Sequence, residues 1–209
     1  IGSTTAANRD NIIAGNTLKD FYSYGIYING NFNTQVDSNH ISRPTRSTVT
    51  TFYGIYVTSL NVSLNISRNT ITDPFGGNLT STSTFNGIYF TGVDALGTLE
   101  NKVINNQVYG LNGNGEQNAL YNSSSDNVWY FHNTILMNGD GGTGTQLTRG
   151  FYQTTTAAGI RLENNIFVIA RQSSGAKYCL YFNTVASDII SNYNDLYLNP
   201  IATNAFTGY

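Results

Sequence analysis

Charged residues are scarce in this chain: Lys, Arg, Asp and Glu together make up 11 % of its 209 residues, and the formal net charge is −2. Nucleic acids and anionic membrane surfaces are bound by clusters of Lys and Arg, so we expect neither as a partner. No apolar run approaches the roughly 20 residues that a membrane-spanning helix needs. The sequence therefore predicts no insertion into a membrane.

Cysteine, histidine and proline are also rare. The single cysteine, Cys179, excludes a disulfide framework within the chain, and with two histidines it makes a zinc site unexpected. Three prolines do not make a linker, and 40 % hydrophobic residues can form a core despite the abundance of Asn, Ser, Thr and Gly. Because the chain starts at Ile1 without a signal peptide, we expect a piece of a mature or longer protein.

A motif of a small residue, an apolar residue and a tyrosine recurs six times. Its tyrosines are Tyr27, Tyr56, Tyr89, Tyr121, Tyr152 and Tyr181. Successive tyrosines are 29, 33, 32, 31 and 29 residues apart. A period near 30 residues that tolerates small insertions is typical of a solenoid. We therefore expect one domain over residues 1–209, with recognisable repeats over residues 8–198.

Each repeat has a second half, in which an Asn precedes an apolar strand position about 12 or 13 residues after the tyrosine. Examples are Asn39-His40-Ile41, Asn69-Thr70-Ile71, Asn133-Thr134-Ile135 and Asn194-Asp195-Leu196. The third repeat allows either Asn101 or Asn106 in this role, and the fifth allows Asn164 or Asn165. An earlier copy at Asn16 indicates a partial coil before the first tyrosine.

Short strands that repeat without helical segments between them favour a parallel β-helix. Side chains alternate between the two faces of a strand, so we place the aliphatic residues beside each tyrosine inside and the tyrosines outside. Successive coils would lie about 4.8 Å apart, and the repeated Asn side chains would form a ladder along the rod. The prediction is an all-β solenoid of about six to seven coils, each of roughly 30 residues.

The spaced Gly-Ile-Tyr and Asn-x-Ile signatures resemble the right-handed parallel β-helix repeat proteins of the pectate-lyase-like superfold. The amino-acid sequences of the repeats, as in Tyr24 to Gly30 and Arg161 to Ile166, are similar to those of long secreted surface proteins of Bacteroidetes-type bacteria. This resemblance implies a fold, and an extracellular or cell-surface location. It does not imply one activity, because the superfold hosts lyases, hydrolases, tailspikes and adhesins.

One polar column could carry acid–base chemistry. If the third repeat uses Asn101, the residues before the repeated Asn fall in one outward row. That row contains Arg68, Glu100, His132 and Glu163. A histidine between two carboxylates suits general acid–base catalysis, whereas an exposed ion-pair ladder would use the same residues and contribute little stability. The alternative register at Asn106 would break the row.

Two Gly-rich turns carry oxygen-bearing side chains that could bind Ca²⁺. These side chains are Asn112, Asn114, Glu116 and Asp140. Spaced oxygen ligands on successive coils can hold this ion, but their spacing fits no EF-hand and ordinary turns use the same residues. We therefore expect no obligatory cofactor.

The tyrosine column is the most informative surface feature. The six tyrosines would stack on one outer face, with Tyr24, Tyr53 and Tyr178 nearby. Such a strip could be a platform for sugar rings or for another protein. It could equally be covered by loops, or serve to stiffen the sheet.

Three functions follow from these patterns. The first is a structural or adhesive segment of a secreted or cell-surface bacterial protein, which self-assembles end to end or laterally or binds other surface chains. The second is a polysaccharide lyase or hydrolase, although paired aspartates of the polygalacturonase type are absent. The third is a non-catalytic module that binds polysaccharide through the tyrosine column.

Overall fold

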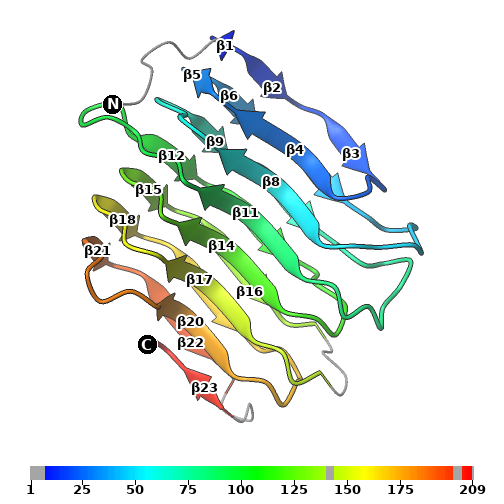
Figure 1. Ribbon diagram of the computed structural model, residues 1–209. Helices are drawn as coiled ribbons and strands as arrows, with labels where there is room; N and C mark the ends of the chain where they lie inside the picture. Colours follow the sequence, from blue (N-terminus) through cyan, green and yellow to red (C-terminus); the bar gives the residue numbers. More distant parts are fainter. Residues whose placement is uncertain (1–7, 140–143, 200–203, 209) are drawn as a thin grey trace.

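The computed structural model describes residues 8–139, 144–199 and 204–208, which form β-strands and no helix. They build a parallel β-solenoid of about 6 turns with roughly 30 residues per turn, which confirms the predicted all-β fold (Figure 1). The described segments contain no helix long and apolar enough to cross a membrane.

Three parallel sheets of seven strands run along the rod. Sheet 1 contains β2 (Ile12–Ala14), β6 (Gln35–Asp37), β9 (Asn65–Ser67), β12 (Asn101–Ile104), β15 (Val128–Phe131), β18 (Ile160–Glu163) and β21 (Ile189–Asn192). Sheet 2 contains β3 (Thr17–Lys19), β7 (His40–Ser42), β10 (Thr70–Thr72), β13 (Gln107–Tyr109), β16 (Thr134–Met137), β19 (Ile166–Ile169) and β22 (Asp195–Leu198). Sheet 3 contains β4 (Tyr24–Asn29), β8 (Phe52–Thr58), β11 (Phe85–Thr91), β14 (Gln117–Ser123), β17 (Thr148–Thr154), β20 (Lys177–Phe182) and β23 (Ala205–Phe206).

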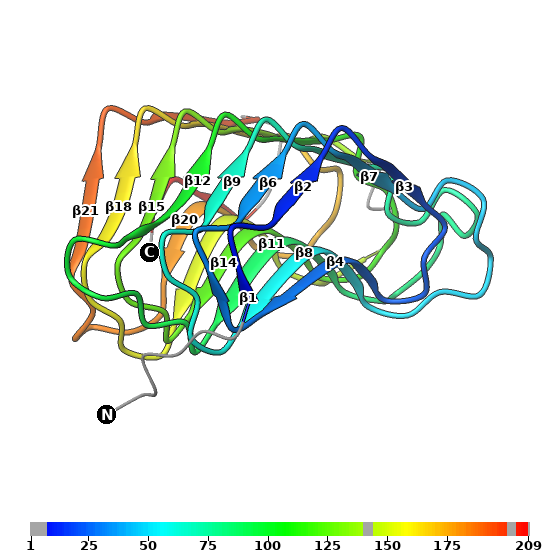
Figure 2. The ribbon, with the colours of Figure 1, turned by 90° about the horizontal axis from the view of Figure 1, so that it is seen from above.

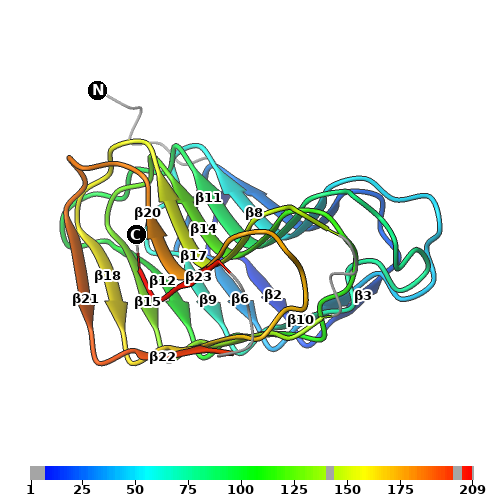
Figure 3. The same cartoon turned by 90° about the horizontal axis from the view of Figure 1, so that it is seen from below.

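Each coil passes through sheets 1, 2 and 3 in that order. Sheet 1 forms one row of strands in Figure 2, and in the view from below β22 of sheet 2 runs along the lower edge, next to the end of β21 (Figure 3). The connections after β7 and β10 project from one side of the rod (Figure 2). A short pair, β1 (Asn8–Arg9) and β5 (Asn31–Phe32), lies outside the three sheets. The tyrosine motif forms sheet 3 and the Asn motif leads into sheet 2, whereas sheet 1 was not apparent from the repeats.

The core lies between the three sheets. In sheet 3 the aliphatic positions on either side of each tyrosine point inward, as predicted, and Ile55 and Val57 have no exposed surface. At these positions in the other coils Ile26, Ile28, Ile88, Phe90, Leu120, Phe151 and Leu180 are buried, Phe182 is partly buried, and Asn122 and Gln153 are buried polar residues. A single coil cannot enclose these side chains, so their burial depends on the coil above and the coil below.

Seven asparagines join successive coils at the corner between sheets 1 and 2. They are Asn16, Asn39, Asn69, Asn106, Asn133, Asn165 and Asn194. At each step the backbone N–H and the side-chain amide of one Asn both donate to the Oδ1 of the next. From Asn39 to Asn69 these distances are 3.0 and 2.9 Å. The predicted ladder is therefore confirmed, and it satisfies the amide groups of its buried members, Asn39, Asn69, Asn106, Asn133 and Asn165.

The ladder selects the register that the sequence left open: Asn106 in the third repeat and Asn165 in the fifth. The left-handed backbone at this corner belongs to the residue before each ladder Asn, such as Arg68 (φ 55°) or Asn105 (φ 56°). Asn101 is also buried, but its side chain bonds Leu64 and Asn61 at another corner.

The small residue of the tyrosine motif faces the interior next to a neighbouring coil. A Cβ built on Gly54 would lie 2.6 Å from the carbonyl oxygen of Gly87, so a side chain there would force the coils apart. Cys179 occupies the same position in the last repeat and is fully buried, as expected for a small residue. Burial raises the pKa of its thiol to about 12.

One buried guanidinium joins three coils at the corner between sheets 2 and 3. Arg43 donates to the carbonyl oxygens of Tyr22, Thr50 and Pro74 at 2.7, 2.9 and 2.9 Å. The rings of Phe52 and Phe75 pack against the guanidinium, and their centroids lie 5.0 and 4.9 Å from Arg43 Cζ. Burial lowers the pKa of Arg43 to about 10, which leaves it charged at neutral pH.

Substitution of a ladder asparagine should destabilise the whole solenoid. Asn133→Ala removes the acceptor for the Asn106 amides and the donor to Val103 and Asn165. Because buried amides would lose their partners, we expect the free energy of unfolding to fall by about 3 kcal/mol or more in urea denaturation. Asn29→Ala, at an exposed site in β4, is the control and should change it by less than about 0.5 kcal/mol. Equal losses in the two variants would contradict a stabilising ladder.

Arg43 offers a second test. Arg43→Ala should lower the free energy of unfolding by about 3 kcal/mol, because three backbone carbonyls and the rings of Phe52 and Phe75 lose their buried partner. Arg43→Lys should recover only part of this loss, since an ammonium lacks the planar fork. The control, Arg9→Ala at an exposed position, should cost less than about 1 kcal/mol. A neutral Arg43→Ala in thermal denaturation would show that these contacts do not stabilise the fold.

Candidate functional site

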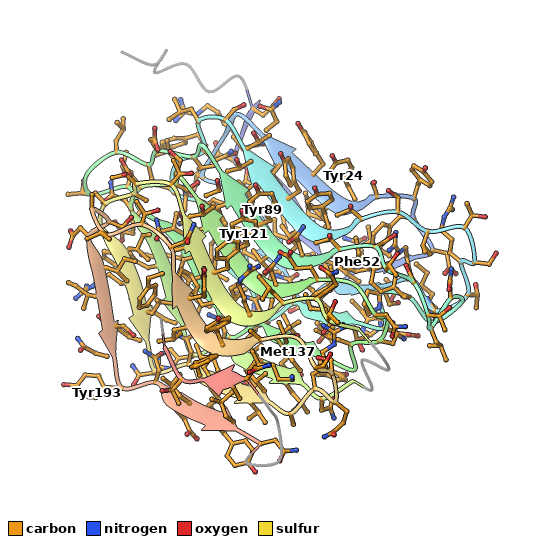
Figure 4. All side chains as sticks on the ribbon, turned by 60° about the horizontal axis from the view of Figure 1, so that its bottom comes forward. Tyr24, Phe52, Tyr89, Tyr121, Met137 and Tyr193 are labelled. Atoms are coloured by element: carbon orange, nitrogen blue, oxygen red, sulfur yellow. The ribbon has the colours of Figure 1, made fainter. Side chains whose placement is uncertain are left out.

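The six motif tyrosines form one continuous column on the outer face of sheet 3. They are paired in register from Tyr27 to Tyr181 through parallel ladders of adjacent strands. Neighbouring ring centroids are 5.3, 5.3, 4.2, 4.4 and 5.4 Å apart along the column. Figure 4 shows Tyr24, Tyr89 and Tyr121 following one another across these strands. The predicted outward stacking of the tyrosines is confirmed.

A second row of aromatic rings flanks both ends of the column. Gly54 and Ile55 are both buried, so Tyr53 and Tyr56, three residues apart, both lie on the outside, with ring centroids 5.1 Å apart. Tyr24 stacks on Tyr53 at 5.0 Å. At the other end Tyr178 stacks on Phe206 at 5.2 Å. The inward Gly-Ile pair therefore widens the column into an aromatic face.

The central rings of the column stack face to face on one another. Tyr89 and Tyr121 are almost parallel, at an interplanar angle of 11°, and Tyr121 and Tyr152 differ by 23°. Their stacking direction follows the rod, so the faces of these rings are covered by the rings of the adjacent coils. Of the alternatives left open by the sequence, a flat platform of exposed ring faces is not formed at the centre of the column, where Tyr89, Tyr121 and Tyr152 are only partly exposed.

Crowding changes the acidity of these phenols. Burial is the main reason that the pKa of Tyr121 lies well above its usual value of 10.0, and the neighbouring Tyr89 and Tyr152 add to the shift. Burial and the adjacent phenols also raise the pKa values of Tyr53 and Tyr56. Tyr53, Tyr56 and Tyr121 therefore keep their protons at neutral pH.

A polar cluster interrupts the second aromatic row at mid-rod. Arg149 donates to Glu116 at 2.7 Å and to Asn118 at 2.9 Å, and Asn118 donates to Asn86 at 3.0 Å. The Arg149 guanidinium also lies 4.0 Å from the centroid of the Tyr152 ring. Arg149 is only 5 % exposed, so its charge is enclosed and paired within the face. Sequence analysis did not identify Arg149, because its contacts come from other coils.

The predicted acid–base row does not form. Arg68 and His132 do precede ladder asparagines, but with Asn106 in the ladder the residue between them is Asn105 and not Glu100. Glu100 lies just before β12, and Glu163 ends β18 in sheet 1. The register chosen by the ladder, not a local rearrangement, separates these residues.

Each charged member of that row has another partner. Arg68 pairs with Asp37 at 2.6 Å, and this hydrogen bond is the main cause that lowers the pKa of Asp37 to about 2. Glu100 pairs with Lys102 at 3.0 Å and Glu163 with Arg161 at 3.2 Å. His132 is exposed. The arrangement consists of separate surface ion pairs.

The oxygen-bearing side chains considered for Ca²⁺ are largely engaged by the protein. Asn112 accepts the backbone N–H of Phe75 at 2.7 Å and donates to Asp73. Glu116 accepts from Arg149 and Asn118. Asp140 lies outside the described residues. Within the described ranges, no group of three or more His, Cys, Asp or Glu side chains is placed to hold a metal ion.

Sheet 1 presents a second aromatic feature that the sequence analysis missed. Trp129, the only tryptophan, lies on the outer face between Lys102 and Arg161, whose charges are 5.5 and 5.2 Å from its ring centroid. Phe131 lies beside it, with ring centroids 5.7 Å apart. Lys102, Trp129 and Arg161 occur in separate repeats, so their proximity depends on strand register.

Comparisons of the chain with protein-family models, with curated proteins and with solved structures found no match.

The raised tyrosine pKa values predict a loss of stability at alkaline pH. Folded Tyr121 keeps its proton above its usual pKa of 10.0, while the unfolded chain ionises there, so folding stability declines as pH rises from about 10. Denaturation midpoints measured between about pH 9 and 11 should fall, and Tyr121→Phe should reduce the slope. An unchanged slope in Tyr121→Phe would contradict burial of this phenol.

Proposed function

We propose that this chain is a structural, adhesive segment of a secreted or cell-surface bacterial protein, and that the tyrosine column binds a second copy of the chain laterally. The observation that carries the proposal is the column itself: six tyrosines in register, stacked on the outer face of one rigid sheet. The resemblance of the repeats to secreted surface proteins supports the location.

The tyrosine face has the properties of an interaction surface. Tyrosine is enriched at protein interfaces because it offers a large apolar area and a hydroxyl group on a side chain with few rotamers. Here stacking on neighbouring coils further limits the motion of Tyr89, Tyr121 and Tyr152. Little conformational entropy would then be lost on binding, so contacts at this face are favoured by preorganisation.

A second copy suits this face for reasons of shape and charge. The column follows the rod, so two rods lying side by side can align their columns over several coils. An arrangement with twofold symmetry uses the same patch on both copies. Arg149, the cation within the face, is paired with Glu116, and the net charge of the chain is only −2. Charge repulsion between two copies is therefore small.

The same geometry gives less support to the two alternatives. Hydrolysis or elimination needs an acid and a base that face a common substrate, and the candidate row is split into separate ion pairs. Binding of sugar rings to the column by stacking needs exposed aromatic faces, but the central rings cover one another.

Removing the central rings should weaken self-association. In sedimentation equilibrium we expect the wild-type chain to associate, and Tyr89→Ala combined with Tyr121→Ala to raise the dissociation constant by about tenfold or more. The matched control is Tyr109→Ala, because Tyr109 is 41 % exposed on sheet 2, away from the column. The control should associate like the wild type.

Two results would overturn the proposal. One is a wild-type chain that stays monomeric up to the highest soluble concentration. The other is undiminished association of the double variant while circular dichroism shows it folded, because association would then use another surface, such as the ends of the solenoid.

A further inference from the structure

The third repeat contains an insertion that changes the outer surface of sheet 1. Seventeen residues separate Tyr89 from Asn106, against 12 or 13 between the tyrosine and the ladder Asn of the other repeats. The extra length lies between β11 and β12, in residues 92–100. Val93 and Ala95 anchor this loop in the protein, and the backbone N–H of Ser63 donates to the Leu99 carbonyl at 3.1 Å. The loop is therefore held against the preceding coil.

The loop and the sheet line an open pocket of about 300 Å³. Its lining is Asn33, Ser63, Leu64, Asn65, Thr98, Leu99, Glu100, Lys102 and Ile104. The volume is at the lower end of the range for small-molecule sites, which suits one ring of a ligand better than a large cofactor. Neither the repeat motif nor the tyrosine column contributes to it, so the pocket is independent of the function proposed above.

An ion pair fixes the polar side of the pocket. Glu100 Oε1 lies 3.0 Å from Lys102 Nζ, and the Glu100 side chain is only 13 % exposed. Burial by itself would raise the pKa of Glu100, but hydrogen bonds from its own backbone amide and from Lys102 outweigh burial and lower the pKa below 4.5. The carboxylate is thus ionised at neutral pH and compensated by one cation.

The lining excludes several classes of ligand. A free anion would meet the Glu100 carboxylate, and a free cation would meet the Lys102 ammonium. A purely apolar ligand would remove the hydrogen bonds that these charged groups make to water and would offer none in their place, which is costly. No aromatic ring lines the pocket, so a planar aromatic ligand would find no stacking partner there. A neutral molecule that both donates and accepts hydrogen bonds fits best.

A sugar ring has this combination of groups. Its hydroxyl groups can donate to Glu100 and accept from Lys102, and the hydroxyls of Ser63 and Thr98 and the amides of Asn33 and Asn65 add further partners. Hydrogen bonds to charged groups are the stronger kind. Its C–H surface can lie against Leu99, which is 38 % exposed, and Ile104. We propose that this pocket is a binding subsite for one neutral, hydroxylated sugar unit of a glycan.

The only tryptophan of the chain provides a built-in reporter for this site. Trp129 lies in the coil after Lys102, and the Lys102 ammonium is 5.5 Å from its ring centroid. A sugar hydroxyl that draws Lys102 toward the pocket changes the charge next to the indole. Tryptophan fluorescence therefore responds to occupancy of the pocket, separately from the tyrosine column.

The test is a titration of the chain, followed by tryptophan fluorescence and by calorimetry. The probes are neutral hexasaccharides of glucose, mannose, galactose and xylose, with hexasaccharides of uronic acid in parallel. We expect saturable binding of at least one neutral hexasaccharide. Glu100→Gln and Thr98→Val keep the shape of the pocket, and each should weaken that binding, Glu100→Gln by about tenfold.

The matched control is Glu163→Gln. Glu163 also pairs with a cation on the outer face of sheet 1, but it does not line the pocket, so its variant should bind like the wild type. Three results would overturn the proposal: no saturable binding of any neutral hexasaccharide, binding of the uronic acid series alone, or unaltered affinity in both Glu100→Gln and Thr98→Val.

Discussion

Hydrogen bonding between successive coils is the constraint on which the rest of the structure depends. Each strand inside a sheet has its backbone partners in the coil before and the coil after, and the asparagine ladder from Asn16 to Asn194 joins the coils in the same way at the corner between sheets 1 and 2. Because each ladder Asn from Asn39 to Asn165 both donates and accepts along the rod, a shift of one residue would leave buried amides unpaired. Register is therefore determined at this corner and carried to all three sheets.

The spacing of about 4.8 Å between coils also decides what the surfaces can do. Aromatic side chains at the same position of adjacent coils come close enough to stack, so Tyr89, Tyr121 and Tyr152 cover one another's faces. Trp129 is enclosed likewise, by Lys102 and Arg161. Regular repetition thus produces smooth faces with stacked rings and paired charges, which suit contact with another large surface. The pocket occurs where the repeat is broken by residues 92–100.

Most of the fold could be predicted from the sequence, whereas little of the surface chemistry could. The Gly-Ile-Tyr motif identified the strands of sheet 3, their inward residues and the tyrosine column, because side-chain alternation is a local property. The prediction of an acid–base row was wrong because Asn101 and Asn106 both fit the local sequence of the Asn motif. Only the stacking of coils shows that Asn106 meets Asn69 and Asn133, while Asn101 turns toward Leu64. Because Glu100 precedes Asn101, its predicted place in the row was wrong as well.

By itself the sequence determined the period, the solenoid and the outward position of Tyr27 to Tyr181, since each follows from spacing along the chain. The tertiary structure decided the pairing of Arg149 with Glu116, the direction of the tyrosine rings and the pocket beside Glu100. These features join residues about 30 or more positions apart, or depend on how a loop folds over a neighbouring coil. Their distances are set by coil stacking and by the length of each insertion, which no single repeat contains.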